Sequence, residues 1–441
     1  MTQVETQYFV SLNYHYMIYQ NNIEFAAQLD EQDPLKDFRS QFLIPKHKGE
    51  DAIYFCGNSL GLQPVTAQQY VNDQFSNWKN LAIEGFFEGD DPWLGYHKRI
   101  TKTLSEIVGA KNDEVTIMNS LTVNLHLLMV SFYKPTKKRY KILMEGGAFP
   151  SDQYAVDSQV KFHGLDTKDA VIELFPKEGE HTLRTEDILQ KINEHADDLA
   201  LVLFGGINYF TGQLFDMPAI TKAAHEIGAF AGFDLAHAAG NVILKLHEWD
   251  VDFACWCSYK YMNSGPGGIS GIFVNEKHFD DKSLNRFEGW WGYREDKRFL
   301  MAPGFQPDKG AAGWQLSTSP IMLLALHKAS LDIFEKAGGL APLRAKSELL
   351  TGYLEFLILE INKNNGEELF TMITPKTAAD RGCQLSIVCK QNAKATFSYL
   401  TENGVIGDWR EPNVIRLSPV PLYNTFKEVY EVGRILSDSI H

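Results

Sequence analysis

Seven short, almost wholly apolar runs most constrain what this chain can fold into. They lie between about Gln63 and Gln306, at residues 115–118, 140–144, 171–175, 200–204, 230–234, 253–258 and 271–274. Several of them are nearly continuous apolar runs, which are typical of strands that are buried on both faces. Helical patterns such as Leu121–Phe132 and Met217–Ile227 separate them. The alternation therefore predicts an α/β domain with a mostly parallel seven-stranded sheet.

Two of these runs end in side chains that suit cofactor chemistry. Asp234 ends one run, and Tyr259 and Lys260 follow the next, just before a glycine-rich turn. In pyridoxal phosphate enzymes a lysine supplies the Schiff-base amine, and a carboxylate keeps the pyridine nitrogen protonated so that the ring accepts electrons. Ligands of parallel sheets bind beyond the carboxyl ends of the strands, where this pair is expected. The pattern favours a pyridoxal phosphate site.

Other interpretations of the same residues remain. Aspartate and lysine at strand ends are often solvated loop residues, and Asp234 with His237 could instead bind a metal, although the sequence offers no further ligand set. A nicotinamide-binding fingerprint is disfavoured, because the glycines after Lys260 precede a strand and do not open a helix.

Charge and composition exclude several classes of partner. The net charge of −14 and the absence of basic runs argue against nucleic acid and anionic membrane surfaces. The first twenty residues do not resemble a signal peptide, and no apolar stretch is long enough to span a bilayer. Five cysteines show no framework spacing: Cys56, Cys255, Cys257, Cys383 and Cys389. We therefore expect a reduced, cytoplasmic, soluble protein with a small-molecule substrate and no metal.

Longer motifs extend this interpretation to a family. They are YFCGNSLGLQP (54–64), MNSLTVNLHLLMVSFYKPT (118–136), FPSDQYA (149–155), GFDLAHAAGNV (232–242), WCSYKYMNSGPGGISG (256–271), GWWG (289–292) and RLSPVPLYNTF (416–426). In this order they resemble the kynureninases, from about Asn22 to the carboxyl end. The resemblance implies the aspartate aminotransferase-like, type I fold of pyridoxal phosphate enzymes. It also implies hydrolysis of the Cβ–Cγ bond of L-kynurenine to anthranilate and L-alanine, in tryptophan catabolism or NAD biosynthesis.

The resemblance also implies a division of the chain. We expect an amino-terminal segment over 1–62 that packs with the small domain, and a large cofactor-binding domain over 63–320. A small α+β domain over 321–441 follows, because after Pro320 the pattern changes to a long helix, strands at 384–388 and 414–417, and a closing helix.

Positions that match the family's motifs are expected to have the family's roles in binding the cofactor. The resemblance implies that Lys260 binds the cofactor and later moves the α-proton, and that Asp234 pairs with the pyridine nitrogen. It places His237 close to the cofactor, Phe149 stacked on the ring and Asp152 near its imine side. Without the family, Phe149 would be interpreted as an ordinary core residue.

The phosphate group and the subunit arrangement involve a second set of positions. The resemblance implies that Leu121 and Thr122 donate to the phosphate at the start of a helix, although Thr122 would otherwise be interpreted as part of a helix cap. Tyr259 and Trp290 are expected to bind the phosphate too, and Tyr259 to relay protons. Trp290 and Thr318 are expected from the other subunit, which implies a homodimer.

Substrate recognition is assigned to a third set. Arg416 is expected to bind the α-carboxylate, with Asn58 and Ser59 beside it, because a guanidinium suits a carboxylate. Without the family, Arg416 would be an ordinary ion-paired arginine. Phe86 and Tyr293 are expected to face the substrate ring.

Four positions depart from the family pattern. Gly205 stands where relatives often carry a hydroxyl residue, so one hydrogen bond near the cofactor is expected to be absent or replaced by water. Phe86 and Tyr293 align with histidines of the animal enzymes, and Thr318 with an asparagine. A less polar wall disfavours an added hydroxyl group on the substrate, so we expect a preference for L-kynurenine over 3-hydroxykynurenine.

Two rival functions remain, one an enzyme with the same fold and one of a different class. A cysteine desulfurase or selenocysteine lyase shares the fold, but it needs a reactive cysteine on a mobile loop. A catalytically inactive relative could act as a binding protein, against which the intact Asp234, Lys260 and Arg416 argue.

Overall fold

The computed structural model describes residues 18–440, so nearly all of the first twenty residues lie outside the described part. The described residues form two compact units. The larger unit comprises Asn58–Leu340 and Thr374–Gly382. The smaller unit comprises the residues up to Gly57, then Ala341–Ile373, and the residues from Cys383 onward.

A seven-stranded sheet forms the centre of the larger unit. Its strand order is β6-β12-β11-β10-β9-β7-β8. Neighbours among β11, β10, β9, β7 and β8 are parallel, whereas β12 runs antiparallel to both β11 and β6. The bounds are β6 Val115–Ile117, β7 Lys141–Glu145, β8 Val171–Leu174, β9 Leu199–Gly205, β10 Phe230–Asp234, β11 Phe253–Trp256 and β12 Gly271–Val274. The expectation of a mostly parallel seven-stranded sheet is confirmed.

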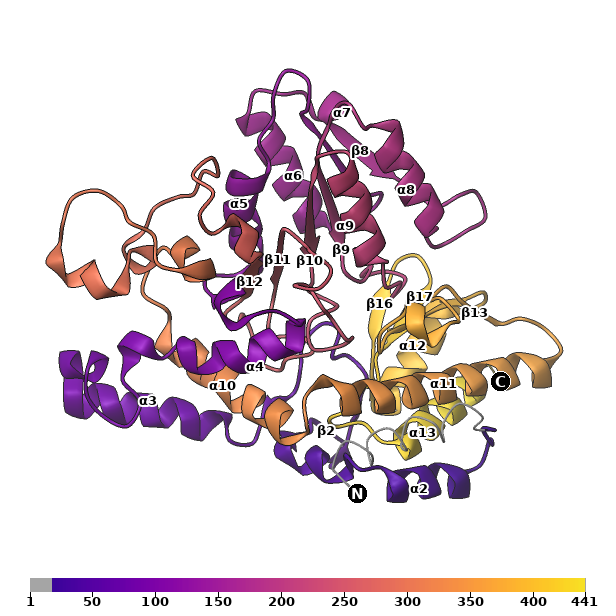
Figure 1. The fold of residues 1–441 in the computed structure, drawn as a ribbon. Coiled ribbons are helices and arrows are strands. Elements are labelled where there is room, and N and C mark those ends of the chain that lie inside the picture. Colours follow the sequence, from indigo (N-terminus) through magenta and orange to yellow (C-terminus); the bar gives the residue numbers. More distant parts are fainter. Residues whose placement is uncertain (1–17, 441) are drawn as a thin grey trace, which may run out of the picture. The chain divides into compact units, whose positions relative to one another are not determined.

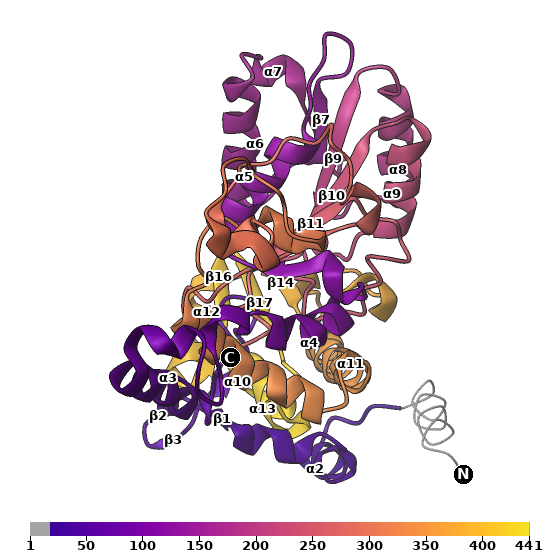
Figure 2. The same cartoon turned by 60° about the vertical axis from the view of Figure 1, so that its left-hand side comes forward.

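Helices cover both faces of this sheet, which explains why most residues of its strands are apolar. Helices α5 (Leu121–Phe132) and α6 (Pro150–Phe162) lie over one face, and α8 (Thr185–Glu194) and α9 (Met217–Glu226) over the other (Figures 1 and 2). On the first face the rings of Phe132 and Phe253 stack at 4.7 Å between centroids. Both faces are thus removed from water, as expected for parallel sheets.

Further elements complete the larger unit. Helix α10 packs on α3 and α4. The bounds are α3 Ala67–Leu81, α4 Lys98–Val108, α7 Thr167–Ala170, α10 Ile321–Lys336 and the short strand β5 Gln63–Pro64. Short 3₁₀ turns include Ala82–Phe86, Trp93–Gly95, Trp290–Gly292 and Glu295–Leu300.

An antiparallel sheet in the order β13-β14-β17-β16 forms the centre of the smaller unit. Its strands are β13 Phe370–Met372, β14 Leu385–Cys389, β16 Asp408–Arg410 and β17 Val414–Leu417. The helices are α2 Ile23–Gln32, α11 Leu340–Asn365, α12 Ala393–Glu402 and α13 Phe426–Asp438. Two-residue strands are β1 Phe42–Leu43, β2 Lys46–His47, β3 Glu50–Asp51, β4 Ile53–Tyr54 and β15 Val405–Ile406. Apolar side chains of the helices and strands form one core.

Polar contacts hold the amino-terminal segment in the smaller unit. The Asp30 carboxylate accepts the backbone N–H groups of Phe426 at 2.7 Å and Lys427 at 3.1 Å, where α13 begins. Nearby, Lys346 of α11 and Asp33 form a buried ion pair at 2.7 Å. A carboxylate at a helix start satisfies amide groups that have no partner within the helix.

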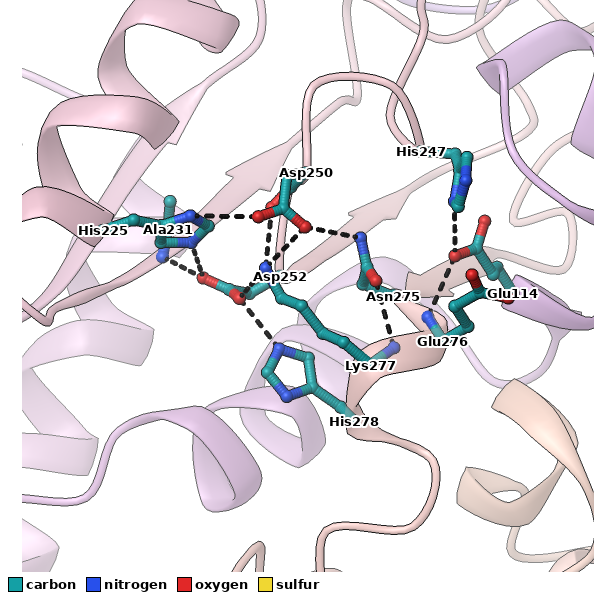
Figure 3. Close-up of polar contacts among 10 residues, drawn as sticks. All are labelled: Glu114, His225, Ala231, His247, Asp250, Asp252, Asn275, Glu276, Lys277 and His278. Atoms are coloured by element: carbon teal, nitrogen blue, oxygen red, sulfur yellow. Dashed lines mark hydrogen bonds and ion pairs between the residues drawn. The ribbon is translucent and has the colours of Figure 1, made fainter.

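A network of charged residues lies at the amino ends of the sheet strands (Figure 3). The buried Asp252, just before β11, accepts from His225 Nε2 and His278 Nε2 at 2.8 Å and from the Ala231 N–H at 2.7 Å. Lys277 Nζ is 3.0 Å away. This network joins β10, β11 and the turn after β12 at the edge opposite the strands' carboxyl ends.

Among the described residues, no helix is both long enough and apolar enough to cross a membrane.

Candidate active site

A cavity of about 170 Å³ opens at the carboxyl ends of the sheet strands in the larger unit. Glu145 ends β7, Gly205 ends β9 and Asp234 ends β10, while the segment after β11 contributes Lys260. The lining residues are Ser120, Leu121, Thr122, Glu145, Phe149, Ser151, Asp152, Gly205, Ile207, Tyr209, Asp234, Ala236, His237, Cys257, Tyr259 and Lys260. The cavity thus lies where parallel sheets bind ligands.

Lys260 reaches this cavity beside His237. Its Nζ lies 3.1 Å from His237 Nε2 and 5.9 Å from the centre of the Phe149 ring. The loop that contains Gly61 holds the lysine segment in place, since the Gly61 N–H donates to the Tyr259 carbonyl at 2.8 Å. A Cβ atom at Gly61 would lie 2.3 Å from the Lys260 carbonyl oxygen, so this close approach requires glycine.

Asp152 and Asp234 form a buried carboxyl pair. The Asp234 carboxylate accepts the Ala236 N–H at 2.7 Å. Burial and then the charge of Asp234 hold the pKa of Asp152 well above its usual value, and burial also raises the pKa of Asp234. Two buried carboxyl groups that lie close together either share a proton or need a cation beside them. A protonated pyridine nitrogen fits this requirement, so the residues suit pyridoxal phosphate.

Glu145 is a third carboxyl group in the cavity. Its Oε2 accepts from Asn208 Nδ2 at 2.7 Å and its Oε1 from the Gly205 N–H at 3.1 Å. Burial raises the pKa of Glu145 to about 7, and the charge of Asp234 adds to the shift. The carboxyl therefore changes its charge near neutral pH.

The starts of two helices line the same cavity. Leu121 and Thr122 open α5, and Ser151 and Asp152 lie in the first turn of α6. The hydroxyl groups of Thr122 and Ser151 lie 2.7 Å apart. Amide groups at helix starts favour an anion, which suits the phosphate of the cofactor.

Tyr259 lines the cavity with a neutral phenol. Burial raises the pKa of Tyr259 well above its usual value, and the neighbouring Cys257 adds to the shift. The phenol therefore keeps its proton at neutral pH and can donate a hydrogen bond or a proton.

The remaining sequence-derived positions lie outside this cavity. Trp290 and Tyr293 line a second cavity of about 390 Å³, where 46% of Trp290 is exposed. Thr318 is exposed, and the Phe86 ring packs edge-on against Trp93 at 5.3 Å.

The positions expected to bind the substrate carboxylate lie in both units. Asn58 is buried and Ser59 is half-buried, and both precede Gly61 in the loop beside the lysine segment. Arg416, in the smaller unit on β17, is buried and forms an ion pair with Asp408.

Several lining residues were not singled out in the sequence, above all Glu145, Tyr209 and Ser151. The signal for Glu145 was present, because an acidic residue ends an apolar run there just as Asp234 does. Nothing comparable marks Tyr209, which the turn after β9 brings to the cavity and which meets the Phe149 ring edge-on at 5.3 Å.

No group of three or more histidine, cysteine or acidic side chains in the described part is arranged to hold a metal ion. All five cysteines lie in that part and none forms a disulfide there; four of them are buried. Burial raises the pKa of Cys255, Cys257 and Cys383, that of Cys383 to about 11, so these thiols are not activated.

Comparisons of sequence identify relatives along nearly the whole chain. A family model described as the kynureninase C-terminal domain matches residues 343–436. A kynureninase of Flavobacterium psychrophilum is 56% identical over 424 residues, covering 96% of this chain and 99% of the relative. A kynureninase of Myxococcus xanthus is 51% identical, covering 95% and 97%. That of Mus musculus is 47% identical, covering 93% and 92%.

Comparisons of structure find the same fold at low sequence identity. The apo cysteine desulfurase of Thermococcus onnurineus NA1 superposes with a TM-score of 0.72 at 17% identity, covering 88% of this chain and 94% of that one. A C-DES variant with glycine covalently linked to its pyridoxal phosphate cofactor also gives 0.72, at 14% identity, covering 88% and 96%. At such identities the likeness shows the fold alone.

Proposed function

The chain belongs to the kynureninase family of pyridoxal phosphate-dependent hydrolases, and on this premise we propose that it cleaves L-kynurenine to anthranilate and L-alanine. The observation that supports this most is that Lys260, the Asp152–Asp234 pair and Tyr259 line one cavity at the carboxyl ends of the sheet. The bound cofactor supplies an electron sink for the carbon atoms of the substrate next to its amino group. The protein side chains supply binding, orientation and proton transfer.

Lys260 and Asp234 divide the proton chemistry. We assign to Lys260 the removal of the α-proton, because an amine in the cavity can act as a base beside that carbon. Its Nζ is oriented by His237 at 3.1 Å. Asp234 keeps a proton on the ring nitrogen, and Asp152, with its raised pKa, donates to Asp234 and so holds that carboxylate in place.

Tyr259 and Arg416 complete the assignment. The neutral Tyr259 phenol is suited to move a proton during cleavage of the Cβ–Cγ bond. We assign binding of the α-carboxylate to Arg416, which pairs with the Asp408 carboxylate on its own unit and has the forked guanidinium that suits such a group. The family resemblance assigns Asn58 and Ser59 to the same substrate group. One water molecule is consumed: its oxygen enters the carboxyl group of anthranilate, and Cβ takes a proton to become the methyl group of alanine.

The experiment mixes the cofactor-loaded protein with L-kynurenine and follows anthranilate fluorescence. We expect a rising signal that Lys260→Ala abolishes. Lys138→Ala serves as the control, because this lysine is exposed and paired with an exposed aspartate. Cofactor-loaded wild-type protein that yields no anthranilate would refute the proposed reaction.

We also propose that the enzyme prefers L-kynurenine to 3-hydroxykynurenine. The family resemblance assigns the aromatic side chains Phe86 and Tyr293 to the substrate ring, and a hydroxyl group buried there without a partner would cost about 1–3 kcal/mol. The measurement is kcat/KM for both substrates. Phe86→His should narrow the difference, and a wild-type value that is higher for the hydroxylated substrate contradicts the proposal.

A homodimer with shared sites is the proposed assembly. It is supported by Trp290, which is half-exposed next to the exposed Phe299 at 5.8 Å between ring centroids, away from the Lys260 cavity. Trp290 and the exposed Thr318 would then reach the partner's phosphate site. Sedimentation of the holoenzyme should show a dimer, and a monomer with full activity would overturn the assignment of both residues.

The absence of a disulfide among the five cysteines of the described part supports the proposed cytoplasmic location, since reducing compartments keep thiols from forming disulfides. Burial of four of the five is also a reason to prefer C–C hydrolysis over desulfuration, which needs an accessible thiolate.

A further inference from the structure

Three neighbouring strands of the large sheet end in Glu145, Gly205 and Asp234. Strand β9 lies between β7 and β10, and Gly205 is directly paired with Asp234 across the sheet. Glu145 and Asp234 are therefore separated by a residue without a side chain. A Cβ atom at position 205 would lie 2.8 Å from Glu145 Oε1, so the glutamate carboxyl occupies the place of the missing side chain.

Specific contacts hold the Glu145 carboxyl in that place. Asn208 donates to one oxygen at 2.7 Å and the Gly205 N–H to the other at 3.1 Å, and the residue is only 5% exposed. The backbone at Gly205 has no left-handed φ. The glycine is thus explained by the space that the carboxyl needs, and not by an unusual turn.

The charged groups around Glu145 belong to the cofactor cavity. Asp234, on β10, raises the pKa of Glu145, and Glu145 in turn adds to the raised pKa of Asp152, on α6. The other titratable side chains that line the cavity are His237, Cys257, Tyr259, Lys260 and Tyr209. On its other side Glu145 lines a separate cavity of about 300 Å³ together with Tyr209 and His181.

We propose that Glu145 is a further positioning residue of the pyridoxal phosphate site. Gly205 makes room for its carboxyl group, and Asn208 orients it. Through the Asp152–Asp234 pair, Glu145 sets how many protons the site holds when the cofactor binds. The inference rests on the proposed function, because it requires that the cavity bind this cofactor.

A definite sign follows for proton linkage. A cationic ring nitrogen beside Asp234 offsets the negative charge that favours the protonated form of Glu145. The pKa of Glu145, about 7 without cofactor, therefore falls on binding, and a proton is released. Because the bound state favours deprotonated Glu145, this group makes the affinity for the cofactor rise as the pH increases through neutrality, in addition to any effect of other titrating groups.

The test titrates the full-length chain, stripped of cofactor, with pyridoxal phosphate between about pH 6 and 8. Dissociation constants are compared for the wild type, Glu145→Gln and Gly205→Ala, whose new methyl group displaces the carboxyl. Since one pKa unit is a factor of ten, we expect the wild-type affinity to rise up to about tenfold more over this range than that of either variant. Comparison with the variants removes the titrations of the cofactor and Lys260, which all three proteins share.

Glu114→Gln is the matched control, because this glutamate is also buried but lies at the opposite edge of the sheet. It should retain the wild-type pH dependence. If both variants bind the cofactor with the pH dependence of the wild type, the inference is wrong even though the proposed function stands. If the wild type does not bind pyridoxal phosphate, the proposed function itself is wrong. Two different substitutions are used so that poor folding of one leaves the other decisive.

Discussion

At the scale of single residues, partners decide whether a buried carboxyl group carries a charge. Glu145 faces two N–H donors and the carboxylate of Asp234, so burial prevails and raises its pKa to about 7. Asp252, at the other edge of the sheet, meets two histidines and a lysine. These partners outweigh burial and hold the pKa of Asp252 well below its usual value. The cavity edge of the sheet thus holds a carboxyl group that can exchange a proton, whereas Asp252 at the other edge, drawn in Figure 3, remains charged.

Replacing Asp252 with asparagine should lower the free energy of unfolding by about 3 kcal/mol. Asp252 is buried, and an amide with one acceptor oxygen cannot replace the contacts of its carboxylate with His225, His278 and Lys277. Urea unfolding at neutral pH measures the change. The control is Asp250→Asn, since the Asp250 side chain is 58% exposed and should matter little. Equal stabilities of the two variants would contradict the assigned role.

The pH dependence of this difference has a definite sign. The pKa of Asp252 is lower in the folded than in the unfolded chain, so its contribution is complete above the unfolded value of about 4. It is lost as pH falls from there towards the folded pKa. The gap in stability between wild type and Asp252→Asn should therefore be constant near neutrality and narrow below about pH 4. A gap that narrows on raising the pH towards 8 would count against this account.

At the scale of secondary-structure elements, the sequence predicted the large sheet well because its strands are buried on both faces. The apolar runs match β6–β12 to within one or two residues at each end. Strands β13 and β16 were not predicted, because each has three residues and their sequences, FTM and DWR, lack a continuous apolar pattern. Packing within the smaller unit, which local sequence does not show, places them in the antiparallel sheet.

The candidate site was predictable to a similar extent. Residues near the ends of apolar runs, such as Asp234 and Lys260, line one cavity because strand ends meet at one edge. Glu145 carries the same local signal as Asp234, an acidic residue at the end of an apolar run, but its place beside Gly205, sixty positions later, follows only from the fold. No local pattern contains such a pair. Trp290 and Thr318, assigned from the family alone, lie outside this cavity and stay predictions.

The pairing of β10 with β11 yields a prediction about sheet packing. A Cβ atom at Gly232 would lie 2.1 Å from the ring of Phe253, which is itself stacked on Phe132. Gly232→Ala should therefore cost about 1–3 kcal/mol of stability through overpacking. Gly95→Ala is the control, because no atom lies within 4 Å of the added methyl group. Thermal unfolding compares the two, and an unchanged Gly232→Ala melting temperature would show that the ring can move aside.

At the scale of the whole molecule, the smaller unit is built from segments near both ends of the chain. Helix α2 packs on α13, and Asp33 pairs with Lys346 of α11 in a buried site. Burial lowers the pKa of Lys346, whereas Asp33 opposes this shift. The pair thus joins segments that are more than three hundred positions apart in the sequence.

Lys346→Ala should destabilise this unit by about 3–5 kcal/mol, because it leaves the Asp33 carboxylate buried without its cation. The measurement is urea unfolding, combined with proteolysis near the amino-terminal segment, which should become faster. Lys138→Ala removes an exposed ion pair and should change the unfolding free energy by less than about 1 kcal/mol. If both variants unfold alike, the pair does not hold the segment.

The composition of the smaller unit also sets an order of events during synthesis. Helix α2 emerges from the ribosome early, yet its partner α13 is made about 400 residues later. At the usual rate of about 5–20 residues per second, this delay is on the order of 20–80 s. All of the larger unit, which ends at Gly382, is made before the last strands and α13 of the smaller unit. Until α11, whose Tyr353 ring meets Phe25, and then α13 are made, the apolar face of α2 lacks these partners. We therefore expect the nascent amino-terminal segment to bind chaperones that act on unfinished chains.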